Sequence, residues 1–187
     1  MSTLNTLFKA LMSVVLVSLC AYGLIALSSL WMFAKPSIQL GQVMTITTSQ
    51  VNAQANTTPD QKPAIHLMSG WAYPEGWGAW SIADKATLSL PKPPSNAKSL
   101  VLEARALVTS KHPEQLVKVM INGQLRSSAT LTKEDGNQII IPVEAGDFSG
   151  DRLAVELQLP NLISPSALGI GKDDRQLAIG LKSARYQ

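Results

Sequence analysis

The sequence predicts an all-β fold, an antiparallel β-sandwich of the jelly-roll kind, preceded by one N-terminal transmembrane helix. Beyond residue 38, short segments of alternating apolar and polar residues follow one another between turn residues. No amphipathic helix of useful length interrupts these segments. Ahead of them, residues 10–34 contain no charged residue. Strands without intervening helices are typical of a sandwich.

The uncharged segment is the first element. As a helix, residues 10–34 would span roughly 37 Å, which exceeds the ~30 Å hydrocarbon core of a bilayer. The apolar region of a cleaved signal peptide is shorter, about 7 to 15 residues. We therefore expect an uncleaved, single-pass anchor in the lipid bilayer, with residues 1–9 in the cytoplasm. Lys9 and Lys35 lie on opposite sides of this segment, so the positive-inside rule does not decide its orientation. We expect the long C-terminal part to lie outside, because a long domain after an N-terminal anchor is commonly exported.

Charge and cysteine content argue against a nucleic-acid-binding protein and against a disulfide-stabilised one. The formal net charge is +3, but only two of the 16 Lys and Arg residues, Lys9 and Lys35, precede Ile38, and none of the 13 Asp and Glu residues does. The remainder is nearly neutral and has no basic run, so nucleic acid is not an expected partner. The single cysteine, Cys20, lies in the expected anchor, so no disulfide stabilises the exported part.

The segments after the anchor divide into a linker and a domain. Residues 35–63 are expected to hold one strand, within residues 37–48, and then a polar linker. Residues 64–187 are expected to form the sandwich. Asn122-Gly123 ends one of its strands and is the strongest short hairpin signal. The expected strands of the domain are residues 86–90, 100–108, 116–121, 138–143, 153–160 and 176–181.

Three of the four tryptophans lie between residues 70 and 81. Glycine and proline in this segment make a continuous helix unfavourable, so a turn-rich loop is predicted. Two interpretations remain open at this point. Flat aromatic faces beside hydrogen-bonding groups suit a sugar ring, whereas aromatic residues also cluster in cores for ordinary packing reasons.

A second segment, residues 160–181, contains Asn161, a Ser-Pro pair and the block Asp173-Asp174-Arg175-Gln176-Leu177. Together with the tryptophan loop and the Asn-Gly hairpin, it resembles the accessory β-sandwich domain of bacterial membrane transferases that build or decorate surface glycans, including phosphoglycerol-transferase-like proteins. The resemblance covers roughly residues 67–184. It implies a domain outside the cytoplasm on the bacterial inner membrane, near a glycan-processing membrane enzyme. The catalytic membrane portion of those proteins is missing here.

Catalytic signatures are absent from the sequence. His66 and His112 have no partner at metal-ligand spacing, and no nucleophile motif occurs. We therefore expect no enzyme, no catalytic residue, no cofactor and no metal site. Two alternatives use the carboxylates: Glu75 with Asp173 or Asp174 could form a glycosidase pair, and the same acids could hold a structural Ca²⁺.

These observations predict a carbohydrate-binding or accessory module for cell-surface oligosaccharides or polysaccharides. The alternative is a scaffolding subunit of a membrane complex, in which the tryptophans belong to the core. Glu75 and Arg175 would contact sugar hydroxyls, or would pair with each other and tie the two loops together. The expected ligand-binding residues are Trp71, Tyr73, Glu75, Trp77, Trp80 and Arg175.

Overall fold

The computed structural model describes residues 38–46, 64–148 and 150–187, which belong to one compact unit, Ile38–Gln187. The expected anchor at residues 10–34 and the linker residues 47–63 lie outside the described residues. Among the described residues, no helix is long and apolar enough to cross a membrane.

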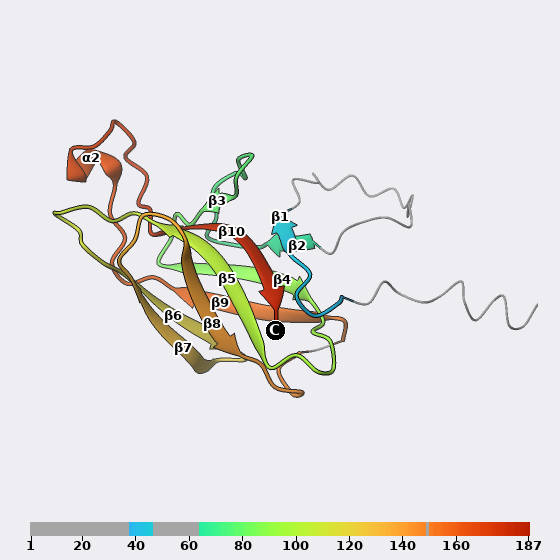
Figure 1. Ribbon diagram of the computed structural model, residues 1–187. Coiled ribbons are helices and arrows are strands. Elements are labelled where there is room, and N and C mark those ends of the chain that lie inside the picture. Colours follow the sequence, from blue (N-terminus) through green and yellow to red (C-terminus); the bar gives the residue numbers. More distant parts are fainter. Residues whose placement is uncertain (1–37, 47–63, 149) are drawn as a thin grey trace, which may run out of the picture. The chain divides into compact units, whose positions relative to one another are not determined.

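The described part of the chain is all-β, as predicted, apart from one helix of four residues (Figure 1). Its elements are β1 (Met44–Ile46), β2 (Ala64–Leu67), β3 (Ala79–Trp80), β4 (Lys85–Pro91), β5 (Ser99–Ala106), β6 (Gln115–Ile121), β7 (Gln124–Leu131), β8 (Asn137–Pro142), β9 (Arg152–Gln158), α2 (Pro165–Leu168) and β10 (Ile179–Tyr186).

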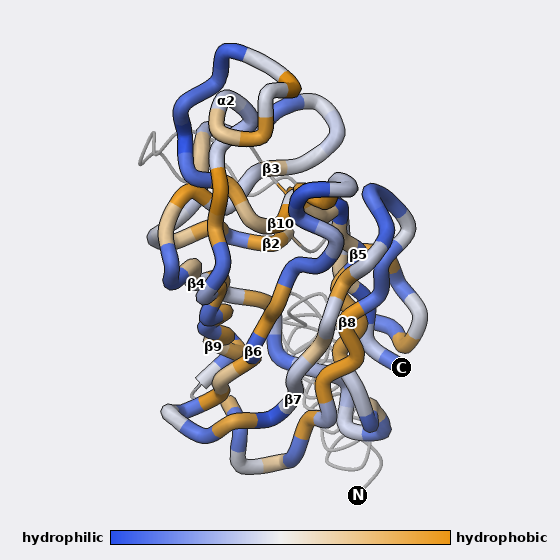
Figure 2. The backbone as a smooth tube through the Cα atoms, turned by 90° about the vertical axis from the view of Figure 1, so that its left-hand side faces the viewer, coloured by the Kyte–Doolittle hydropathy of each residue, from blue (hydrophilic) through white to orange (hydrophobic). Residues whose placement is uncertain are grey.

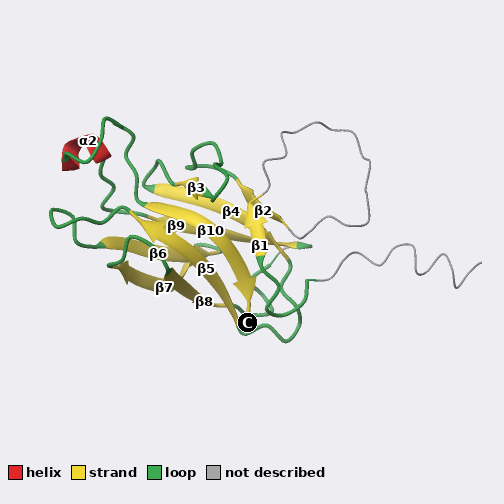
Figure 3. Ribbon diagram, turned by 45° about the horizontal axis from the view of Figure 1, so that its top comes forward, coloured by secondary structure: helices red, strands yellow, loops and turns green. Residues whose placement is uncertain are grey.

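The strands form two layers, as Figure 3 shows. One layer, here called the β10 layer, has the order β1-β10-β5-β8, and β3 also pairs with β10. The other, the β9 layer, has the order β2-β4-β9-β6-β7. From β4 to β10 the chain changes layer at every step except the β6–β7 hairpin. The short β1 pairs with both β2 and β10 and joins the layers; its pairing with β2 is parallel, whereas the other strand pairs are antiparallel.

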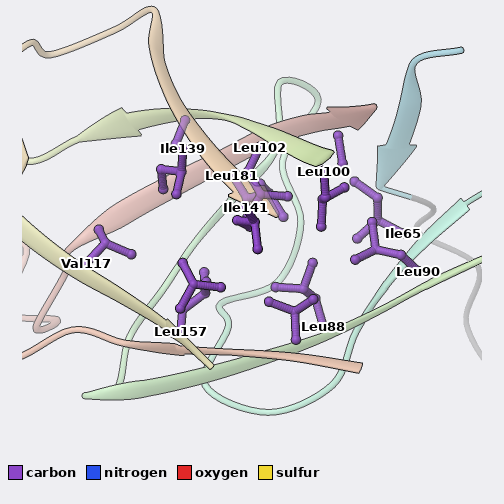
Figure 4. Close-up of a cluster of buried hydrophobic side chains, with 14 of the residues drawn as sticks. Ile65, Leu88, Leu90, Leu100, Leu102, Val117, Ile139, Ile141, Leu157 and Leu181 are labelled. Carbon is purple, nitrogen blue, oxygen red and sulfur yellow. The ribbon is translucent and has the colours of Figure 1, made fainter. Parts of the chain in front are cut away.

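The core lies between the two layers (Figure 4). Alternation along the strands sends every second side chain inward, so Val117, Val119 and Ile121 of β6 are buried while Leu116 and Lys118 are exposed. Figure 2 shows the same change between hydrophobic and hydrophilic residues along the strands. The sequence pattern therefore predicted the inward face correctly.

The hairpin prediction is confirmed, and the last strand needs a correction. Asn122 and Gly123 have φ values of 51° and 76°, the left-handed pair that a two-residue hairpin turn requires. The last strand was predicted at residues 176–181, but β10 begins at Ile179 and continues to Tyr186. Leu177 instead forms an isolated β-bridge with Ile163. A bulge after Leu181 interrupts the alternation of apolar and polar residues, so the sequence pattern does not show where the strand ends.

Residues before the expected start of the domain also belong to the sandwich. Met44 of β1 is fully buried and pairs with Ala184 of β10, and Ile38 is buried in the same core. The amide of Gly41 donates to the carbonyl of Tyr186 at 2.8 Å. The described fold thus begins at residue 38, and β1 fills the gap between the two layers.

We predict that Met44→Ala lowers the free energy of unfolding by about 2–5 kcal/mol, because it opens a cavity where the layers meet. The neighbouring Val43 is 52% exposed, so Val43→Ala is the matched control, with an expected change of about 0.5 kcal/mol or less. Urea unfolding followed by tryptophan fluorescence measures both. Equal losses for the two variants would show that β1 is not part of the core.

Candidate functional site

The tryptophan loop, residues 70–81, is an ordered hairpin and not a helix, as predicted. The amide of Ala72 donates to the carbonyl of Trp80 at 2.8 Å, and the amide of Glu75 donates to the carbonyl of Gly78 at 2.7 Å. At its end, β3 pairs with the first residues of β10, with Trp80 opposite Gly180. The loop is therefore held to the β10 layer by backbone hydrogen bonds at several points.

Two glycines allow this close approach. A Cβ atom at Gly78, whose φ is 153°, would lie 2.1 Å from the carbonyl oxygen of Leu181. A Cβ atom at Gly180 would lie 2.6 Å from the Cη2 atom of Trp77. Gly180 therefore leaves the space on the strand that the six-membered ring of Trp77 occupies.

Trp77 and Trp80 pack against each other on the outer face of the β10 layer. Their ring centroids are 5.5 Å apart with an interplanar angle of 70°, an edge-to-face arrangement. Arg105 of β5 lies opposite Gly180, and its guanidinium is 5.3 Å from the centroid of the Trp77 ring. We call Trp77, Trp80, Arg105 and Gly180 the outer-face cluster. Both indoles are half-buried, so they are neither core residues nor open platforms.

Trp71 and Tyr73 have opposite environments. The indole nitrogen of Trp71 donates to the carbonyl of Thr87 at 2.8 Å, and its ring packs against the main core. Tyr73 lies two residues further along and is 69% exposed. Of the aromatic residues in the loop, Tyr73 is thus the one whose ring is presented to solvent.

Glu75 and Arg175 do not pair with each other, although that pair was one of the two expected outcomes. Glu75 accepts a hydrogen bond from the indole nitrogen of Trp77 at 2.7 Å. Arg175 instead binds Asp173, with its Nε atom 3.0 Å from both carboxylate oxygens. This hydrogen bond raises the pKa of Arg175 and lowers the pKa of Asp173; the charge of Glu75 adds to the rise of the Arg175 pKa, so Glu75 lies within electrostatic reach.

The segment that carries Arg175 lies at the same end of the sandwich as β3 (Figure 1). Its helix α2 begins after the N-cap Ser164, and the amide of Ser166 donates to the carbonyl of Asp173 at 3.0 Å. Figure 2 shows that the chain after α2 is strongly hydrophilic. An exposed aromatic ring, a carboxylate and an ion pair therefore share one end of the molecule.

Sequence reasoning missed Arg105 and Gly180. Arg105 is on a strand that alternates regularly, and nothing in that pattern marks one outward residue as functional. Gly180 did carry a signal, because a glycine inside a strand often marks a close approach of other atoms. Only the register, which aligns Trp80, Gly180 and Arg105 across three strands, shows what approaches.

No metal ligands gather at this end: among the described residues, no three His, Cys, Asp or Glu residues lie close enough to hold a metal ion. Two of the cavities that the described residues form lie elsewhere. One of about 250 Å³ lies between the loop around Pro93 and the loop around Phe148. The other, of about 210 Å³, lies on the β9 layer beside Gln158.

A family described as "Domain of unknown function (DUF7024)" matches residues 45–186. The chain belongs to this family. The DUF7024 match begins in β1 and ends with the last residue of β10, so it includes the strand that joins the layers. The description names no transferase, and the expected link to phosphoglycerol-transferase-like proteins stays a prediction. No curated protein matches the sequence.

Several solved structures are similar to this chain at low sequence identity, among them the following three. A family two carbohydrate esterase from Clostridium thermocellum, an active site mutant in complex with celluohexase, has 8% identity and a TM-score of 0.37, over 67% of this chain and 33% of the other. CsCBM6-3 from Clostridium stercorarium, in complex with cellobiose, has 9% identity and a TM-score of 0.34. The match covers 68% of this chain and 84% of the other. The carbohydrate-binding module CBM36, in complex with calcium and xylotriose, has 11% identity and a TM-score of 0.35. The match covers 68% of this chain and 91% of the other. Because all three TM-scores are below 0.5, we infer no property of this chain from these similarities.

We predict that Gly180→Ala displaces the Trp77 ring and lowers the free energy of unfolding by about 1–3 kcal/mol, because the added methyl overpacks the outer-face cluster. Near-ultraviolet circular dichroism should change as the indole pair separates. Gly76→Ala is the control on the same loop, since a Cβ atom there meets nothing within 4 Å. A Gly180→Ala variant with the native spectrum and stability would refute the close packing.

We also predict that Arg175→Gln raises the pKa of Asp173 toward its ordinary value, because the hydrogen-bonding guanidinium is lost. The folded pKa of Asp173 is depressed, so this interaction stabilises the fold at pH values above the unfolded pKa and is lost as the pH falls. Carboxyl-detected NMR titration measures the shift, with Lys172→Gln as the control. An unchanged Asp173 pKa in Arg175→Gln would contradict the pairing.

Proposed function

We propose that the sandwich is a non-catalytic carbohydrate-binding module, and that its contact surface is the end formed by residues 70–81 and 173–175. In this proposal residues 10–34 anchor the module in the bacterial cytoplasmic membrane, with the sandwich outside the cytoplasm. The module would serve a membrane enzyme that assembles or modifies surface glycans.

The observation that carries the proposal is the exposed ring of Tyr73 on a fixed hairpin. A sugar ring has an apolar face that stacks on an aromatic ring, and the hydroxyl of a tyrosine adds a hydrogen-bonding group at the edge of that ring. The hairpin is held by the hydrogen bonds of Ala72 and Glu75 and by β3, so the backbone that carries Tyr73 is in place before binding. Preorganisation of this kind reduces the entropy lost on binding.

Polar groups at the same end of the sandwich as Tyr73 suit sugar hydroxyls. A hydroxyl both donates and accepts, so it pairs with the carboxylates of Glu75 and Asp173 and with the guanidinium of Arg175. All three belong to the same end, and Glu75 and Arg175 are exposed. Within this proposal Trp71 and Trp77 position the loop, while the half-buried Trp80 adds an edge to the surface.

The direction of β10 fits an anchored module. Gly41 lies at the C-terminal end of β10, through its hydrogen bond to Tyr186, whereas Trp80 lies opposite Gly180 at the N-terminal end of that strand. The seven steps from Ile179 to Tyr186 correspond to about 23 Å. A chain that leaves the bilayer near residue 34 would then enter the sandwich at the end opposite the proposed glycan surface.

A scaffolding role is the second candidate, and the half-burial of Trp77 and Trp80 favours it. Their edge-to-face packing and the bond from Trp77 to Glu75 use these indoles inside the protein. In that case the loop would stabilise the domain and contact no sugar.

Replacing Tyr73 separates the two candidates. We predict that Tyr73→Ala weakens binding of a surface oligosaccharide by about tenfold or more, since each 1.4 kcal/mol of lost contact is a factor of ten. The free energy of unfolding should change by about 0.5 kcal/mol or less, because the ring is exposed. Isothermal titration with an oligosaccharide that the wild type binds, found on a glycan array, gives the affinity.

Two further variants complete this test. Leu125→Ala on β7 removes another exposed apolar side chain, 56% exposed, and should leave affinity unchanged. Trp77→Ala should lower the free energy of unfolding by about 1–3 kcal/mol, less than the full cost of a buried tryptophan. Full affinity in Tyr73→Ala, or a wild type that binds no glycan, would favour the scaffold.

A further inference from the structure

A polar pocket on the β9 layer lies beyond the end of the tryptophan loop. The first residue of the loop lies close to the pocket lining, since a Cβ atom at Gly70 would lie 2.1 Å from the carbonyl oxygen of Lys85. The volume of the pocket, about 210 Å³, equals roughly seven waters at their liquid volume. Its lining residues are Asp84, Lys85, Lys118, Gln158, Leu159 and Pro160.

The floor of the pocket is a row of residues across three strands. Gln158 of β9 pairs with Lys85 of β4 on one side and with Lys118 of β6 on the other. Residues paired across neighbouring strands point to the same face, about 5 Å apart, so both lysines flank the Gln158 side chain. The side-chain amide nitrogen of Gln158 donates to Glu156 at 3.0 Å, and the same amide group carries a carbonyl oxygen that can accept a hydrogen bond.

The walls of the pocket are fixed. The amide of Leu159 donates to the carbonyl of Asp84 at 2.8 Å and ties the two walls together. Next to Pro160, the side-chain oxygen of Asn161 accepts from the amide of Leu116 at 2.9 Å and from the Gln115 side chain at 2.6 Å. The pocket therefore has a preformed shape, which binding does not have to create.

Opposite charges in this pocket remain unneutralised. Lys85 is 3.9 Å from Glu156, whereas Asp84 and Lys118 form no ion pair within the described ranges. An anion would be attracted by Lys85 and Lys118 but repelled by the carboxylate of Asp84, and a cation would be attracted by Asp84 but repelled by the two lysines. A hydroxyl donates to a carboxylate and accepts from an ammonium group, so a polyol satisfies both.

We infer that this pocket binds the hydroxyl groups of one neutral sugar residue, as a second contact point on the layer opposite the outer-face cluster. The inference rests on the proposed function for the class of its ligand. No aromatic side chain lines the pocket, so hydrogen bonds and not stacking determine the affinity there. A glycan bound at Tyr73 and at this pocket would gain from both contacts.

The test uses the full chain, labelled with ¹⁵N, in a detergent without sugar headgroups. Glucose and inorganic phosphate are the two probes. Glucose should shift the side-chain amide signal of Gln158, with a dissociation constant on the order of 10 mM, because one small ligand makes few contacts. Asp84→Asn and Lys118→Gln should each weaken this effect about tenfold, whereas Lys98→Gln, an exposed lysine outside the pocket lining, should not.

The outcomes separate the pocket from the aromatic site. A larger shift of Gln158 with phosphate than with glucose would overturn the inference, because it would identify an anion site. Shifts at the indole signal of Trp80 without any at Gln158 would overturn it too, while leaving the proposed function in place. Glucose shifts at neither site would count against both.

Discussion

Strand β10 supports both the sandwich and the candidate site, because its edge opposite β5 is shared by two short strands. β1 occupies the half near Ala184 and completes the core, whereas β3 occupies the half near Gly180 and holds the tryptophan loop. The bulge between Leu181 and Ser183 separates the two halves. The position of the loop is therefore fixed by the same strand that closes the β10 layer.

The candidate site depends on small residues as much as on aromatic ones. Gly78 and Gly180 let the loop approach the sheet, and Trp77 then fills the space above Gly180 beside Arg105. Trp71 and Trp77 make contacts inside the protein, whereas the ring of Tyr73 is exposed. The loop thus divides its aromatic residues between holding a shape and presenting a surface.

The sequence predicted the all-β class, the inward faces and the hairpin at Asn122, because these depend on local alternation and on left-handed turn residues. It did not predict β2 or β3, which are short and lack a clear pattern, nor the end of β10 beyond the bulge. The contacts of Glu75 and Arg175 were beyond prediction as well. Glu75 binds Trp77 and Arg175 binds Asp173, in each case a residue two positions away in the sequence. Only the folded loops show that these side chains, and not each other, are within hydrogen-bonding distance.

The central claim is that Tyr73 contacts the glycan while Trp71 and Trp77 hold the loop in place. Hydroxyl-radical footprinting read by mass spectrometry measures this directly, because oxidation of a side chain falls when a ligand covers it. With a bound oligosaccharide, the account predicts strong protection of Tyr73 and unchanged oxidation of Trp71 and of Leu125 on β7. Unchanged oxidation of Tyr73 in the saturated complex would contradict it.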